Sequence, residues 1–217
     1  MQAPRLVFDS SLGELIPRLR QLTDSPAAPV VDLSVLHDFP AAYSSSAVVL
    51  VGVRRQAGYG PRDVIRRARH ALPCAALFVI DQGRHLSPGE RRQLAIAGID
   101  EIIRLDHAPG RQRLAELVRR RTRVQAPERA LYQAAATPLA PAVGALVRWV
   151  LRNAYFRPSI EHVAAVFQVT SKTITRTLAR HGAPRFGVLK ELGILLYARE
   201  MEIRYGLTRS EAARRLG

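Results

Sequence analysis

The chain has 217 residues, and its 33 Lys and Arg residues against 18 Asp and Glu residues give it a formal net charge of +15. A hydrophobic share of 47% with 24% charged residues is typical of a folded globular protein and excludes a disordered one. The length allows one or two domains, each with its own core. No apolar run reaches about 18 residues, and the N-terminus lacks a secretory pattern, so we expect a cytoplasmic protein without a membrane segment.

The net charge indicates the kind of partner, and the cysteine content limits the kinds of site. The positive excess favours a polyanion, most simply nucleic acid. The only cysteine, Cys74, excludes an internal disulfide and a multi-cysteine metal site. Because it precedes an apolar run, we expect it to be a small buried hydrophobe. We therefore expect neither a metal nor a cofactor.

Residues 1–122 alternate short apolar runs with helical patterns. The runs lie at 6–8, 29–33, 47–53, 75–80 and 101–105, and the helical patterns lie at 12–22, 62–72, 88–98 and 111–122. A further helix within 34–46 is weakly indicated, because Pro40 and the serines there favour a loop. Strands interleaved with helices predict an α/β domain, namely a flavodoxin-like doubly wound parallel sheet of five strands in the order 2-1-3-4-5.

This layout resembles a response-regulator receiver domain, but most of the receiver's chemical motif is missing. A receiver has an acidic pair after its first strand, where this chain has Asp9 and Ser10, and a phospho-accepting Asp after its third strand. Here the third strand ends in Gly52, Val53 and Arg54, without a carboxylate. The resemblance therefore implies a degenerate receiver that works without phosphorylation. A domain that serves only as a dimerisation scaffold is an equal alternative.

The switch point between the first and third strands is a candidate ligand crevice, because ligands of doubly wound sheets bind there. The residues expected to line it are Asp9, Ser10, Ser11 and Gly52. The receiver motif is also missing after the fourth and fifth strands. A receiver has Ser or Thr and then Lys there, where this chain has Asp81 with Gln82 and Arg104 with Leu105 and Asp106.

Residues 123–136 form an Ala-rich linker, and residues 137–217 show helical patterns only. A first helix is marked by Leu139, Val143, Leu146 and Val150. A long helix after residue 185 is expected to face a core with Leu189, Leu192, Leu196 and Ile203. Gly206 is a plausible end for it, and Thr208 with Glu211 forms a capping box for a last helix.

Residues 159–181 predict a helix-turn-helix. Ser159 and Thr170 are good N-caps for two short helices joined by a turn at Gln168 and Val169. In the second helix Ile174 and Leu178 share one face and leave a polar, basic face on the other side. Such a helix can lie in the major groove of DNA and read bases with its N-terminal half. An ordinary helical hairpin with a solvated outer face is the alternative.

The C-terminal segment is similar to the DNA-binding domain of AraC-type transcription regulators, which holds two helix-turn-helix units joined by a long helix. The similarity covers about 80 residues, through the segments ALVRWVLRNAYFRPS, SIEHVAAVFQVTSKTITRTLARHGAP, LLYAREMEI and GLTRSEAARRLG. Gln168 departs from the family's usual Gly, and Lys172 from its larger or aromatic residues. The second unit is incomplete at Gly217, either because the natural product is longer or because one reading helix suffices.

The resemblance implies double-stranded DNA as the partner and assigns the contacts by position. It places Lys172, Thr175 and Arg176 at base edges and Ser171, Thr173 and Arg180 at phosphates. Arg176 can fork onto guanine, and Thr175 can meet a thymine methyl. A single reading helix rarely binds tightly, so we expect a homodimer, and the helices at 88–98 and 111–122 are suited to a symmetric interface.

Two other classes of function compete with a DNA-binding regulator. An enzyme is disfavoured, because the chain offers no nucleophile–base pair, no metal cluster and no phosphate-binding loop. A non-DNA adaptor that uses the receiver-like domain to bind a protein is the main alternative. The sequence gives neither the operator nor an effector.

Overall fold

The computed structural model describes residues 6–33, 48–53, 60–72, 75–81, 83, 86–123 and 139–216 of the chain. The chain divides into two compact units, Met1–Gln125 and Ala126–Gly217, and each is described by itself. The helix expected within 34–46, Cys74, and all of the expected linker after Arg123 lie outside the described residues, as do Arg54 and Gln82.

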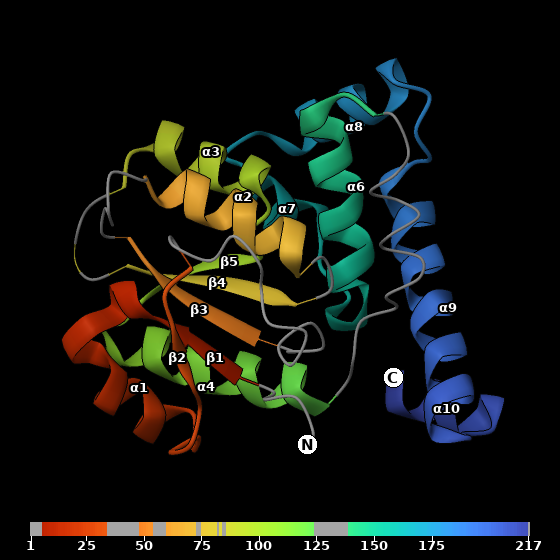
Figure 1. Ribbon diagram of the computed structural model, residues 1–217. Coiled ribbons are helices and arrows are strands. Elements are labelled where there is room, and N and C mark those ends of the chain that lie inside the picture. Colours follow the sequence, from red (N-terminus) through yellow and green to blue (C-terminus); the bar gives the residue numbers. More distant parts are fainter. Residues whose placement is uncertain are drawn as a thin grey trace. The chain divides into compact units, whose positions relative to one another are not determined.

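Unit 1 is built on a parallel sheet of five strands (Figure 1). The strands are β1 (Leu6–Asp9), β2 (Val30–Val31), β3 (Val48–Gly52), β4 (Ala76–Asp81) and β5 (Glu101–Arg104), in the order β2-β1-β3-β4-β5. This is the predicted fold class and strand order. β2 lies at one edge of the sheet and has only two residues.

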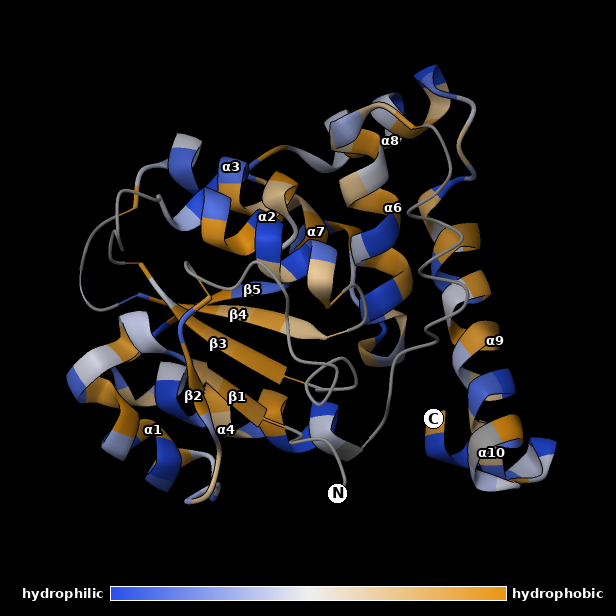
Figure 2. Cartoon of the chain, in the orientation of Figure 1, coloured by the Kyte–Doolittle hydropathy of each residue, from blue (hydrophilic) through white to orange (hydrophobic). Residues whose placement is uncertain are grey.

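Both faces of the sheet are buried under helices, which explains the near-continuous apolar runs of its strands. Alternate residues such as Val49 and Val79 pack with α2 (Pro61–Ala71) and α3 (Pro88–Ala97). The residues between them, such as Leu50 and Phe78, pack with α1 (Ile16–Leu22) and α4 (Ala108–Arg123). Figure 2 shows the hydrophobic strands between the two helical layers.

Two helices of unit 1 differ from their expected bounds. The segment 12–22 is a 3₁₀ stretch, η1 (Ser10–Leu15), followed by α1, because Gly13 takes a positive φ of 50° inside it. α4 begins at Ala108 and not at 111. Gly110 makes this early start possible, since a Cβ there would lie 1.7 Å from the carbonyl oxygen of Arg104.

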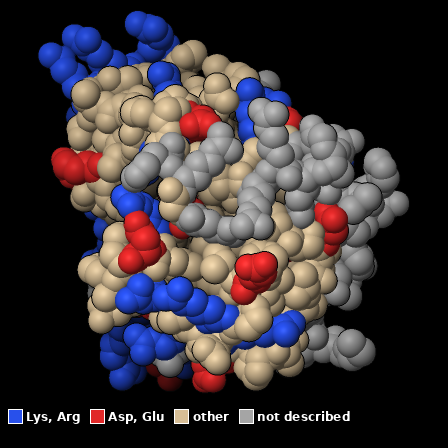
Figure 3. Space-filling model, turned by 90° about the vertical axis from the view of Figure 1, so that its left-hand side faces the viewer, with Lys and Arg blue, Asp and Glu red and all other residues tan. Residues whose placement is uncertain are grey.

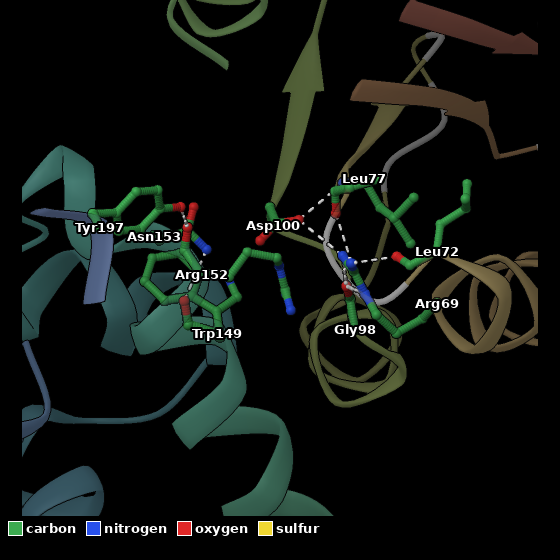
Figure 4. Close-up of polar contacts among 10 residues, drawn as sticks. Arg69, Leu72, Leu77, Gly98, Asp100, Trp149, Arg152, Asn153 and Tyr197 are labelled. Carbon is green, nitrogen blue, oxygen red and sulfur yellow. Dashed lines mark hydrogen bonds and ion pairs between the residues drawn. The ribbon is translucent and has the colours of Figure 1, made fainter. Parts of the chain in front are cut away.

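A buried ionic cluster ties α2 to the start of β5 (Figure 4). The Arg69 guanidinium donates to the Asp100 carboxylate at 2.9 Å and to the carbonyl oxygens of Gly98, Leu72 and Ala75. Asp100 also accepts the backbone N–H of Leu77 at 2.8 Å. Because a buried ion pair is stable only when its remaining polar atoms are bonded, the cluster is a structural joint of unit 1.

The described part of unit 2 is helical throughout. It contains α6 (Pro141–Asn153), the 3₁₀ turn η3 (Ala154–Phe156), α7 (Ile160–Phe167), α8 (Ser171–Arg180), α9 (Phe186–Tyr205) and α10 (Arg209–Leu216). The capping box at Thr208 and Glu211 is present, and Gly206 ends α9 in the left-handed conformation, both as predicted. No helix among the described residues is long and apolar enough to span a membrane.

α9 lies close to η3 and to the end of α6 in the core of unit 2. A Cβ on Gly193 would lie 2.4 Å from the Cβ of Ala154, so only glycine allows this approach. The hydroxyl of the fully buried Tyr197 donates to the carbonyl oxygen of Arg152, and the Asn153 amide donates to the carbonyl oxygen of Trp149 (Figure 4). Trp149 also packs edge-on against Phe167 of α7, with ring centroids 6.4 Å apart.

The expected core face of α9 is partly wrong. Leu189 is buried as predicted, but Leu192 and Ile203 are exposed. The buried face is instead formed by Leu189, Gly193, Tyr197 and Met201. The helix carries apolar residues on two faces, and periodicity alone cannot decide which of them packs inward.

Candidate nucleic-acid interface

The helix-turn-helix of unit 2 forms where the sequence predicts it. The Ser159 hydroxyl accepts the N–H of His162 at 3.1 Å and starts α7, and the Thr170 hydroxyl accepts the N–H of Thr173 at 3.1 Å and starts α8. Gln168 ends α7 in the left-handed conformation, with φ of 51°. Its amide donates to the carbonyl oxygen of Ala165, which satisfies one of the open carbonyls at the helix end.

α8 has one buried apolar face and one exposed basic face. Ile174 and Leu178 are buried, so the helix packs into unit 2 along a single stripe. Lys172, Arg176 and Arg180 are exposed and follow one another at a spacing of four residues, which places them along the outward side of the helix. The ten residues of α8 include no Asp or Glu. The outward face therefore suits an anionic partner.

The structure also places the three predicted hydroxyl-bearing residues. Ser171 is half-buried as the first residue of α8. The Thr175 hydroxyl donates to the carbonyl oxygen of Ser171 at 3.1 Å, which leaves its methyl group and its oxygen lone pairs free to face a groove. The Thr173 hydroxyl lies 2.9 Å from that of Thr170, so it belongs to the helix cap and is less available to a phosphate.

Two arginines that the sequence reading did not assign flank the helix-turn-helix. Arg157 precedes α7 and Arg185 precedes α9, and both are exposed. From Arg157 to Arg185 the chain has five Lys and Arg residues and a single acidic residue, Glu161. This local charge balance was the signal available in the sequence.

Charge alone does not locate the site. Residues 1–125 carry 19 Lys and Arg against 12 Asp and Glu, an excess of seven, and residues 126–217 carry 14 against 6, an excess of eight. On the face drawn in Figure 3, basic side chains gather along the lower part and at the upper edge, with acidic ones between them. The α8 face is distinguished by its geometry and by its lack of acids.

At the carboxyl edge of the sheet, the described residues expected to line a crevice are bonded to one another and to the backbone. Asp9 is fully buried, and its carboxylate accepts the Ser11 hydroxyl and the N–H groups of Ser11 and Leu33. Ser11 in turn accepts the N–H of Gly52 at 2.8 Å. A Cβ on Gly52 would lie 2.9 Å from the carbonyl oxygen of Ser11. Of the four expected lining residues, only Ser10 is partly exposed, and the ligand crevice stays a prediction.

The carboxyl group of Asp9 is buried and hydrogen-bonded within unit 1. Burial raises the pKa of its carboxyl group above the ordinary value of 3.8, against the opposing effect of its hydrogen bonds. Asp81 ends β4 and is buried, and one of its side-chain oxygens has no hydrogen-bond partner among the described residues. The described residues contain no group of three or more His, Cys, Asp or Glu placed to hold a metal ion.

The described residues of unit 1 have a separate hollow of about 840 Å³ between the α1–β2 loop and α4. Thr23, Ser25 and Pro26 of the loop and Glu116 and Arg119 of the helix are among its lining residues. It holds both signs of charge and no nucleophile–base pair, so it indicates no chemistry.

Comparison with known proteins gives no family assignment. No protein-family model matches the chain, and no curated protein matches its sequence. Among solved structures, the chain is similar to the RcsB response regulator of Salmonella typhimurium, with 14% identity and a TM-score of 0.42 over 91% of this chain and 100% of that one. It is also similar to the response regulator ChrA of a heme-sensing two-component system, with 13% identity and a TM-score of 0.38 over 94% and 100%.

A third similar structure is that of the response regulator StyR, with 14% identity and a TM-score of 0.41 over 88% of this chain and 98% of that one. At such identities and scores these similarities assign no activity.

Proposed function

We propose that the chain is a DNA-binding transcription regulator of the AraC type, in which α8 reads the major groove of double-stranded DNA. The observation that carries the proposal is the two-sided character of α8. Ile174 and Leu178 anchor it, while Lys172, Arg176 and Arg180 project from an outward face that has no acidic residue.

The position of each side chain along α8 suggests its role. Arg176 lies in the second turn of the helix, where a guanidinium can donate two hydrogen bonds to guanine O6 and N7. Lys172 lies one turn closer to the N-terminus on the same side, and Thr175 offers a methyl group suited to thymine. Arg180 lies one turn further on, where we expect it to neutralise a backbone phosphate.

We infer that unit 1 is a receiver-like regulatory unit that does not use phosphorylation. β3 ends in Gly52 and Val53, so no carboxylate stands at the acceptor position. The single carboxylate after β1 is already bonded to Ser11 and Leu33. We propose that the protein is not an enzyme, and that control operates through binding to unit 1 or through association of the chain.

A binding selection on randomised duplex DNA with the full chain tests the proposal. We expect one enriched motif, and we expect Arg176→Ala to weaken binding to it by about 1–3 kcal/mol and to relax the preference at one base pair. Arg180→Ala should weaken all sequences alike and lower the slope of log affinity against log salt by about one unit. Arg18→Ala removes an exposed charge from α1 of unit 1 and serves as the matched control.

Each outcome separates the proposal from its rivals. If no motif is enriched, or if Arg176→Ala binds DNA as tightly as Arg18→Ala does, then α8 is only a packing element. That result would favour an adaptor that binds a protein and not DNA. The same titration with acetyl phosphate present should give an unchanged affinity. A stronger or weaker affinity together with a covalent phosphoryl group on unit 1 would contradict the phosphorylation-independent reading.

A further inference from the structure

α9 carries a second apolar stripe on the side opposite its buried face. Val188, Leu192, Leu195 and Ile203 are 53%, 44%, 66% and 69% exposed, respectively. Their spacing of four, three and eight residues places them within one narrow sector of the helix. Figure 2 shows hydrophobic residues along the length of α9.

Such a stripe differs from ordinary surface hydrophobics. Single exposed apolar residues are common in folded proteins, but four large ones in line along a helix mark an interaction surface. α8, of the same unit, shows the usual arrangement, with its large apolar residues buried and its outward face charged. The outward side of α9 is therefore suited to a protein partner and not to a polyanion.

We propose that this stripe is a symmetric dimer interface, in which α9 packs antiparallel against α9 of a second copy with Leu195 at the two-fold axis. In such a pair, residues equally far from Leu195 on its two sides lie opposite each other across the interface. Glu191, four residues before Leu195, then faces the partner's Arg199, four residues after it. Both side chains are exposed.

A parallel pair would instead set Glu191 against Glu191 and Arg199 against Arg199, and such like-charge contacts destabilise an interface. The charge order therefore selects a second copy in the antiparallel arrangement.

Charge reversal in the full chain tests the register without DNA, so its result is independent of the proposed function. A two-fold dimer contains the contact between residues 191 and 199 twice. Glu191→Arg or Arg199→Glu alone sets like charges against each other at both contacts and should raise the dimer dissociation constant about tenfold or more. The double variant restores both ion pairs in the opposite sense and should recover most of the affinity. Sedimentation velocity over a range of concentrations measures each constant.

A cysteine cross-link distinguishes the α9 interface from dimerisation through unit 1, because a disulfide at residue 195 requires the two α9 helices to meet. In a Cys74→Ala background, Leu195→Cys should give a covalent dimer on mild oxidation, because the two cysteines meet at the two-fold axis. Ala179→Cys, on the exposed side of α8, is the matched control and should stay monomeric on a non-reducing gel. A chain that is monomeric throughout, a double variant that fails to recover, or equal cross-linking at both positions would overturn the proposal.

Discussion

The carboxyl edge of the sheet in unit 1 and the outward face of α8 in unit 2 are both rich in polar residues, but they use them in opposite ways. At the sheet edge, Asp9 and Ser11 bond to each other and to the backbone at Leu33 and Gly52. On α8, the three basic side chains point away from the unit. Polar residues that satisfy one another inside a fold hold it together, and those left open to solvent are available to a partner.

The largest effect should come from breaking a closed polar cluster in unit 1. Asp100→Ala leaves the Arg69 guanidinium and the Leu77 N–H without their buried carboxylate, and it should lower the free energy of unfolding by about 3–5 kcal/mol. Urea unfolding followed by far-UV circular dichroism measures it. The neighbouring Glu101→Ala removes a partly exposed ion pair with Arg113 and should cost at most about 1 kcal/mol. Equal costs would mean that burial does not set the strength of these contacts.

A middle-sized effect is expected at the sheet edge itself. Gly52→Ala forces a Cβ to within 2.9 Å of the Ser11 carbonyl oxygen and should destabilise the chain by about 1–3 kcal/mol. Gly89→Ala, in the first turn of α3, meets only a side-chain oxygen at 3.9 Å and should be neutral or slightly stabilising. Urea midpoints of both variants test the difference. If Gly52→Ala were as well tolerated as Gly89→Ala, the close approach of β3 to Ser11 would not be needed for stability.

The smallest effect is a pH dependence. Because burial raises the pKa of Asp9, the folded chain holds this proton to a higher pH than the unfolded chain does, so this group's contribution to stability falls as pH rises from about 3.8 through the raised pKa. Asp9→Asn has no carboxyl group that titrates, so its stability does not include this pH-dependent contribution. The stability of Asp9→Asn relative to the wild type should therefore increase with pH across that window, as measured by urea unfolding at a series of pH values. A flat or opposite trend would mean that hydrogen bonding to the carboxylate outweighs its burial.

The strands of unit 1 and the helices of unit 2 could be predicted because their signals are local. Apolar runs such as that of β4 and N-caps such as Ser159 and Thr170 need no knowledge of distant residues. The same holds for α8, whose single apolar stripe leaves only one way to pack. The fold class and the outward face of α8 could thus be derived from the sequence.

The remaining features depend on contacts between distant segments. The carboxylate of Asp9 accepts the N–H of Leu33, which lies 24 residues away in the sequence. Its other partner, Ser11, accepts the N–H of Gly52, which lies 41 residues from Ser11. In α9 both faces are apolar, and the choice between them is made by Gly193 against Ala154 of η3. The sequence therefore indicated polar groups at the sheet edge and a long helix rich in apolar residues, but not which groups are enclosed or which face of the helix is covered.

The turn between α7 and α8 has a consequence for engineering. Gln168 adopts a backbone conformation that glycine enters without strain, and it offsets that strain in part by bonding its side chain to Ala165. Gln168→Gly would remove this hydrogen bond and make the backbone of the turn more flexible. The angle between the two helices is thus an adjustable property, and a substitution at this one position can change the rigidity of the helix pair.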